Sequence, residues 1–196
     1  SATPQNAGTY TLTATIPATD NTETATATKT VTISRKTVNS PAITVTPSQY
    51  EYTGEAITPN NVVVKDGGQV IPSSEYTLSY SGNTEVGTAA VTVTDVPGGN
   101  YAVSGSGTFV ITGRSLKNAA VTVSGDGLTY NGQAQTPAVT VTLDGKTLTQ
   151  GTDYTVSYSD NTNAGTATVT VTGTGNYEGT PTARTVFSIA KKELTI

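Results

Sequence analysis

The chain of 196 residues contains no cysteine, histidine, methionine or tryptophan. Without cysteine and histidine it lacks thiol nucleophiles, disulfides, the usual zinc ligands and the commonest general base. Paired carboxylates remain as a catalytic route, but the acidic residues fall in expected turns or at strand starts, without the apolar pocket that raises a carboxyl pKa. We therefore expect no catalytic residue, no cofactor, no metal site and no enzyme activity.

Charge is also scarce. Charged residues make up 12% of the chain, the formal net charge is −4 and the isoelectric point is about 4.7. Because nucleic-acid binding depends on clustered lysine and arginine, this balance argues against nucleic acid as a partner. No apolar run is long enough to span a membrane and no signal peptide begins at Ser1. We expect no membrane insertion, and a piece cut from a longer precursor.

What the chain has in plenty is threonine, valine and glycine, arranged with a period of two. Val139, Val141 and Leu143 alternate with threonines, and turn signals such as Asp144-Gly145 separate segments of this kind. Such alternation is typical of a strand with one face on a core and the other in water. No window shows helical periodicity, so the sequence predicts an all-β fold of short strands, with no helices.

The chain repeats itself with an offset of 78 residues, because the segment Tyr52–Gly54 returns as Tyr130–Gly132. The same offset relates further pairs: Asp66-Gly67 to Asp144-Gly145, Tyr76 to Tyr154, and Phe109 to Phe187. A repeat of this length with six or seven strands predicts a small Ig-like β-sandwich.

This period divides the chain into four parts. Residues 41–113 and 114–190 form two full Ig-like repeats. Residues 1–35 match only the C-terminal half of a repeat, and residues 191–196 match a linker and the first strand of a next repeat. Neighbouring repeats are therefore the first expected partners: each small unit gains stability if it shares an interface with its neighbour, and independent folding of each repeat is the equal alternative.

Several motifs of the second full repeat carry a resemblance to a known family. They are Leu128–Gly132, Gly151–Tyr158, Asn161–Val169 and the closing Gly173–Tyr177. Together they resemble the Ig-like and MBG/YDG-type tandem repeats of secreted and cell-wall-attached bacterial surface proteins, over nearly all of residues 41–190. The resemblance implies an extracellular or cell-surface location and a structural or adhesin-like role, and it brings no catalytic or cofactor residues.

Tyrosines are the candidate ligand contacts. Tyr101 and Tyr177 follow asparagine in expected loops, so we expect them to be the best exposed and to be the ones that could contact a ligand. The tyrosines of the two Tyr-x-Gly motifs should instead pack at strand ends, with Gly54 and Gly132 at positive φ. Those of the alternating strands should lie in or beside the core.

Two further chemistries are weaker. The oxygen-rich loop Asp160–Asn163 lacks the spacing of an EF-hand, and Asx turns explain it without calcium. A crosslink between Lys117 and Asn176 is conceivable, as in some wall-anchored sandwich domains, but the first full repeat has its one lysine in a turn, at Lys65. We expect neither a calcium site nor a crosslink.

Three functions follow from this pattern. The leading interpretation is a spacer or stalk that presents distal domains for adhesion. The first alternative is an adhesive module that binds carbohydrate or a host protein, and the second is a fibre subunit that exchanges strands between copies. Aromatics buried equivalently in both full repeats favour the spacer, whereas an exposed aromatic cluster in one repeat favours binding.

The N-terminal half repeat raises a separate question. Its two strands present an apolar face, formed by Tyr10, Leu12, Ala14 and Ile16 together with Val31 and Ile33, without a partner sheet. A two-stranded ribbon is marginal in water by itself. We expect a neighbouring chain, preceding sequence or packing on the first full repeat to cover it, with the strand around Leu194–Ile196 of another copy as a natural donor.

Overall fold

The computed structural model describes residues 3–125, 127–179 and 182–195, which form two compact units. Unit 1 takes in Ser1–Ser48, Thr58–Asn83 and Thr88–Phe109. Unit 2 takes in Gln49–Ile57, Thr84–Gly87 and Val110–Ile196. Each unit is described by itself below.

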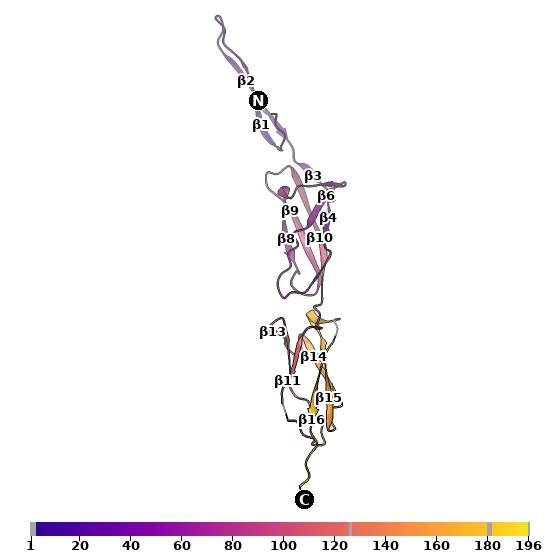
Figure 1. The fold of residues 1–196 in the computed structure, drawn as a ribbon. Coiled ribbons are helices and arrows are strands. Elements are labelled where there is room, and N and C mark those ends of the chain that lie inside the picture. Colours follow the sequence, from indigo (N-terminus) through magenta and orange to yellow (C-terminus); the bar gives the residue numbers. More distant parts are fainter. Residues whose placement is uncertain (1–2, 126, 180–181, 196) are drawn as a thin grey trace. The chain divides into compact units, whose positions relative to one another are not determined.

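The described chain is all-β, as the sequence predicts, and its strands pair mostly antiparallel (Figure 1). In chain order the strands are β1 (Gly8–Ile16), β2 (Ala25–Ile33), β3 (Lys36–Val38), β4 (Ala42–Val45), β5 (Gln49–Glu51), β6 (Val62–Asp66), β7 (Gln69–Val70), β8 (Tyr76–Ser81), β9 (Gly87–Asp95), β10 (Tyr101–Thr112), β11 (Ala120–Val123), β12 (Val139–Leu143), β13 (Lys146–Thr147), β14 (Tyr154–Ser159), β15 (Gly165–Gly173) and β16 (Ala183–Ile189). Two single-turn 3-10 helices, η1 (Ser73–Glu75) and η2 (Gly175–Tyr177), are the helical elements of the described residues.

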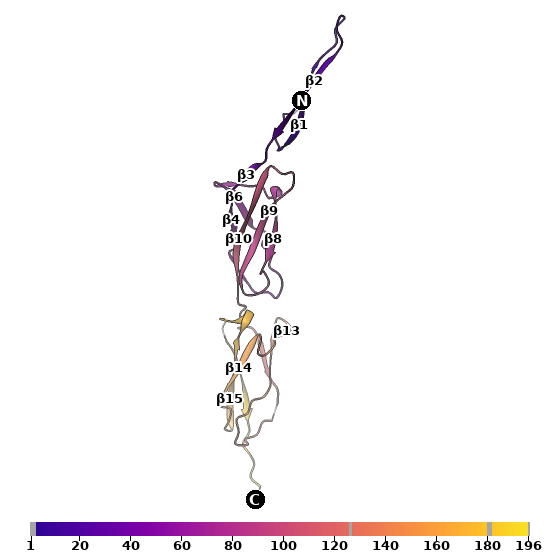
Figure 2. The same cartoon turned by 180° about the vertical axis from the view of Figure 1, so that it is seen from behind.

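Unit 1 contains two sheets, drawn from opposite sides in Figures 1 and 2, and its buried side chains form a core. One sheet has the order β4-β6-β7, and the other β3-β10-β9-β8. Alternate residues of the strands turn inward, so that Val62 and Val64 are buried while Val63 between them is exposed. The core cluster consists of Val38, Val64, Ile71, Tyr76, Val93 and Val103.

Unit 2 contains the equivalent sheets β11-β12-β13 and β14-β15-β16. Ala167, Val169 and Val171 of β15 are fully buried, and the threonines between them are not. Unit 2 also includes a parallel pairing of β5 with the end of β10, over Val110–Thr112. The architecture of both units is consistent with a β-sandwich.

The two full repeats do not keep a constant offset. Ile71 N donates to Val64 O at 2.9 Å, and Leu148 N donates to Val141 O at 2.9 Å, so these residues are related by 77. The prediction that Asp66-Gly67 corresponds to Asp144-Gly145 is therefore wrong by one residue. Pro59 is followed by two residues before Val62, whereas Pro137 is followed by one before Val139. The offset is again 78 by Asp153, since Glu75 O accepts from Val96 N as Asp153 O accepts from Thr174 N.

The N-terminal ribbon of β1 and β2 has the same register as β15 and β16. Gly8 pairs with Ile33 as Gly165 pairs with Ile189, and Ala14 pairs with Ala27 as Val171 pairs with Ala183. The hairpin of residues 8–33 therefore has the same strand register as the hairpin of β15 and β16.

The apolar face of this ribbon is uncovered in the described chain. Leu12 is 51% exposed and Ile16 is 68% exposed, whereas Val169, the counterpart of Leu12, is fully buried. The prediction that packing on the first full repeat could cover this face is wrong. Strands β1 and β2 pair only with each other among the described strands, so the ribbon lacks both the third strand and the facing sheet that bury β15.

Two equivalent buried tyrosines make the stability of the fold depend on pH in the alkaline range. Tyr76 and Tyr154 are buried, and their hydroxyls donate to the carbonyl oxygens of Val62 at 3.4 Å and Val139 at 3.1 Å. Burial raises the pKa of both phenols above the usual value of 10.0. The folded state therefore keeps these protons to a higher pH than the unfolded state.

The free energy of unfolding should consequently be level below about pH 10 and fall as the pH rises from there toward the folded pKa values. Urea unfolding followed by circular dichroism at a series of alkaline pH values measures this decline. The double variant Tyr76→Phe/Tyr154→Phe should decline less steeply, and an unchanged slope in that variant would contradict the assignment.

Candidate functional site

The two tyrosines singled out in the sequence have different surroundings. Tyr101 opens β10 and is half-buried, with Lys36 Nζ 6.0 Å from its ring centre. Tyr177 lies in η2 and is buried, so the prediction that it is exposed is wrong. Its ring packs edge-to-face on Tyr52, with centroids 5.8 Å apart and an interplanar angle of 82°. Burial also raises the pKa of Tyr177.

The asparagine before Tyr101 makes a complete set of hydrogen bonds. The side-chain amide of Asn100 donates to Asn6 Oδ1 at 3.2 Å and to Glu75 Oε1 at 3.1 Å. Its Oδ1 accepts from Ala7 N at 2.7 Å, and its backbone N donates to Glu75 Oε2 at 2.6 Å. Both amide hydrogens and the amide oxygen are thus used, which fixes the orientation of Asn100.

The asparagine before Tyr177 repeats this arrangement within unit 2. Asn176 Oδ1 accepts from Val86 N at 3.0 Å, and its amide donates to Glu85 Oε2. Glu85 and Val86 precede the strand-opening Gly87 just as Asn6 and Ala7 precede Gly8. The same pair of contacts therefore occurs twice. The asparagine Oδ1 accepts from the backbone N–H of the residue before the glycine, and the asparagine side-chain N–H donates to the side chain of the residue before that one.

Two basic residues, Lys36 of β3 and Arg114 just after β10, hold the backbone of the same two loops, and we call them the linker bases. Lys36 N donates to Asn100 O at 2.7 Å, and Arg114 N donates to Asn176 O at 2.9 Å. Each base also forms an ion pair with an acid at a hairpin turn, Lys36 with Asp66 at 2.7 Å and Arg114 with Asp144. Hydrogen bonding to Asp66 raises the pKa of Lys36. Exposed pairs of this kind contribute little energy, so they orient the linker more than they stabilise it.

An apolar side chain follows each linker base by two residues. Val38 is 6% exposed and belongs to the core cluster of unit 1, and Leu116 is fully buried in unit 2. These linker side chains are anchors, because each enters a core while the base beside it contacts an Asn-Tyr loop.

The sequence carries a signal for this site in its two Asn-Tyr pairs. Asn100-Tyr101 and Asn176-Tyr177 match each other, yet only their tyrosines were expected to contact a ligand. The structure gives the asparagine the larger number of contacts. In the described chain the Asn176 side chain bonds to Glu85 and Val86, and Lys117, its conceivable crosslink partner, is exposed.

Within residues 3–125, 127–179 and 182–195, no cluster of three or more acidic side chains is placed to hold a metal ion. No helix in that part of the chain is long and apolar enough to cross a membrane.

A scan against protein-family models and a search of curated proteins gave no match to the chain. The fold itself places the chain among all-β proteins of β-sandwich type.

Replacing Asn176 by alanine should lower the local stability of unit 2 by about 1 kcal/mol, since two partly exposed hydrogen bonds are lost. Hydrogen exchange at the Val86 amide, which loses its acceptor, measures the effect directly. Asn163→Ala is the matched control, because Asn163 stands where Asn6 and Glu85 stand but is exposed in unit 2. Equal effects of the two substitutions would disprove the role of the Asn176 contacts.

Proposed function

We propose that the chain is a spacer: tandem structural repeats of a bacterial extracellular surface protein that hold distal domains for adhesion. The observation that carries this proposal is the equivalent use of aromatic residues for packing in both full repeats. Tyr80 and Phe109 meet edge-to-face at 6.4 Å and 72°, and Tyr158 and Phe187 do so at 6.3 Å and 79°.

The hydroxyls of these tyrosines are used in the same way. Tyr158 donates to Pro137 O at 2.6 Å, and Tyr80 donates to Pro59 O. An aromatic ring that recognises sugar needs a free face beside polar groups. These rings instead pack edge-to-face on each other, and the tyrosine hydroxyls donate hydrogen bonds to the backbone of the same repeat. Residues that recur for packing support a repeated structural unit more than a repeated binding site.

The extracellular location is part of the proposal. Its support is the resemblance to surface-protein repeats together with a chain that has no cysteine and few charges. Threonines on the outward faces of the strands suit a surface that is both exposed and β-forming.

Surface display tests the spacer role. The chain is inserted between a cell-wall anchor and a small epitope, and binding of a bulky antibody to the epitope is compared with that of a display lacking the chain. A spacer should increase antibody binding per displayed epitope, and a flexible Gly/Ser insert of equal length serves as the control. No gain from the chain would count against the proposal.

A glycan array run on the same protein tests the first alternative. Tyr101 is half-buried beside Lys36, so it is the tyrosine to replace first. If a glycan binds saturably and the Tyr101→Ala substitution removes that binding, the chain is a carbohydrate-binding module and not a spacer.

A further inference from the structure

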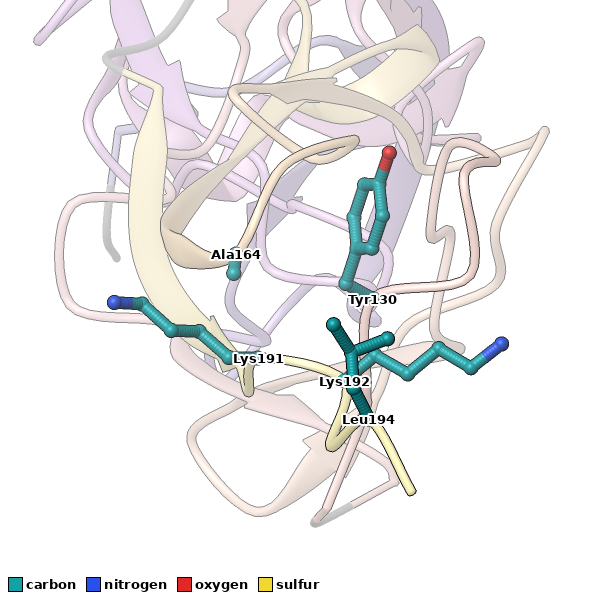
Figure 3. Close-up of a pocket in the computed structure, with 5 residues that line it drawn as sticks. All are labelled: Tyr130, Ala164, Lys191, Lys192 and Leu194. Atoms are coloured by element: carbon teal, nitrogen blue, oxygen red, sulfur yellow. The ribbon is translucent and has the colours of Figure 1, made fainter. Parts of the chain in front are cut away.

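Unit 2 has an open apolar pocket beside the described C-terminal residues. Tyr130, Ala164, Lys191, Lys192 and Leu194 line an apolar pocket of about 390 Å³. In Figure 3 the two lysine side chains point away in opposite directions, and the ring of Tyr130 extends away from Leu194, which lies near the backbone end of that side chain. We call this pocket the terminal face.

Each residue of the terminal face has a counterpart 78 positions earlier, and the counterparts of Tyr130, Ala164 and Lys192 are contacted in unit 2. The ring of Tyr177 packs edge-to-face with that of Tyr52, the counterpart of Tyr130. Val86, the counterpart of Ala164, donates to Asn176 Oδ1 at 3.0 Å. The Asn-Tyr loop thus covers the earlier copy of this surface.

The linker shows the same contrast. Arg114, the counterpart of Lys192, donates its backbone N–H to Asn176 O at 2.9 Å. Leu116, the counterpart of Leu194, is fully buried, whereas Leu194 is 87% exposed. Tyr130 is 39% exposed, against 8% for Tyr52. The described residues 191–195 belong to no strand, and Ile196 lies outside the described residues.

We propose that the terminal face is the docking surface for a further repeat of this same kind, which presents an Asn-Tyr loop. Its tyrosine packs edge-to-face on Tyr130, and its asparagine amide bridges the Asn163 side chain and the Ala164 N–H. This inference rests on the proposed spacer function and deepens it by naming the partner of the surface.

The bridging residues are suited to this loop. Asn163-Ala164-Gly165 repeats Asn6-Ala7-Gly8 residue for residue. Asn6 and Ala7 bind the Asn100 amide at 3.2 and 2.7 Å. The carbonyl oxygen of the incoming asparagine would accept from Lys192 N, and Leu194 would enter the core of the incoming repeat, as Val38 enters that of unit 1.

The ribbon tip of another copy fits the terminal face less well. At the corresponding turn between β1 and β2 the chain has Asn21-Thr22, which offers an amide but no ring for Tyr130. A complete repeat with its tyrosine is therefore the occupant that reproduces every contact seen around Asn176.

The test extends the full chain by one repeat. Residues 117–196 are copied directly after Leu194, so that the linker keeps its spacing, and the reactivity of Tyr130 toward tetranitromethane is measured by peptide mass spectrometry. Reactivity should fall about fivefold, the ratio of the exposed fractions of Tyr130 and Tyr52, 39% and 8%. The control carries alanine at the appended counterparts of Asn176 and Tyr177, and it should restore the reactivity.

A folded appended repeat that leaves Tyr130 fully reactive overturns the proposal. A second measurement needs no extension: Tyr177→Ala in the original chain should raise the reactivity of Tyr52 about fivefold, to the level of Tyr130. A Tyr52 that stays unreactive also overturns the proposal, because the Asn-Tyr loop would then not be what covers this surface.

The outcomes separate this inference from the spacer role. A chain that increases epitope binding while Tyr130 remains reactive next to a folded repeat keeps the spacer and loses the docking surface. A soluble oligosaccharide panel that protects Tyr130 in the original chain replaces the docking surface by a ligand site. No gain in epitope binding together with a protected Tyr130 removes the spacer role but leaves the repeat-to-repeat contact.

Discussion

Truncation of Leu116 to alanine is expected to destabilise unit 2 by about 2–5 kcal/mol. Leu116 is fully buried, so its removal takes apolar surface from the core and leaves a cavity that its neighbours fill only in part. Hydrogen exchange at the amides of Val169 and Val171 in β15 reports the loss, because these residues lie in the centre of unit 2.

Leu194→Ala is the matched control for this experiment. Leu194 follows Lys192 as Leu116 follows Arg114, but it is 87% exposed. Its truncation should change the stability of the chain by no more than about 0.5 kcal/mol. If the two substitutions lower the free energy of unfolding equally, Leu116 is not an anchor.

Truncation of Phe109 to alanine is expected to destabilise unit 1 by about 3–5 kcal/mol. Phe109 is almost completely buried, and its ring meets Tyr80 edge-to-face at 6.4 Å. The substitution loses both the burial of a large ring and the aromatic contact. Exchange at the amides of Val91 and Val93 in β9 measures the effect within unit 1.

Val110→Ala provides the comparison on the same strand. Val110 follows Phe109 in β10 and turns to the opposite face, where it is exposed. Its truncation should cost less than about 1 kcal/mol, because few atoms lose contacts. A cost for Val110 equal to that for Phe109 would show that the two faces of β10 are not inside and outside.

Much of the strand pattern could be predicted because it depends on neighbouring residues. Alternation of valine and threonine indicated which residues of β15 turn inward, and Ala167, Val169 and Val171 are fully buried. The two Tyr-x-Gly motifs predicted glycines at positive φ, and Gly54 and Gly132 have φ of 86° and 83°. Both features follow from local geometry, since side chains alternate along a strand and only glycine accepts such φ values at no cost.

The role of the Asn-Tyr loops could not be predicted in the same way. The partners of Asn176 and Tyr177 are Glu85, Val86 and Tyr52, which lie far away along the chain. No local pattern carries that information. The one-residue shift between β6 and β12 was hidden for a similar reason, because a hairpin turn keeps its sequence motif when its register on the neighbouring strand changes.

The sequence by itself determined the strands and the turns, because period-two patterning and glycine conformation act over a few residues. It also determined the similarity between the repeats, which is visible in their matching residues. The tertiary structure alone decided which of two equivalent side chains is buried. Tyr52 and Tyr130 occupy the same position of the repeat, as do Leu116 and Leu194, yet in each pair one is buried and the other is exposed. Burial is a property of the atoms that pack against a side chain, and for Tyr52 these include the ring of Tyr177.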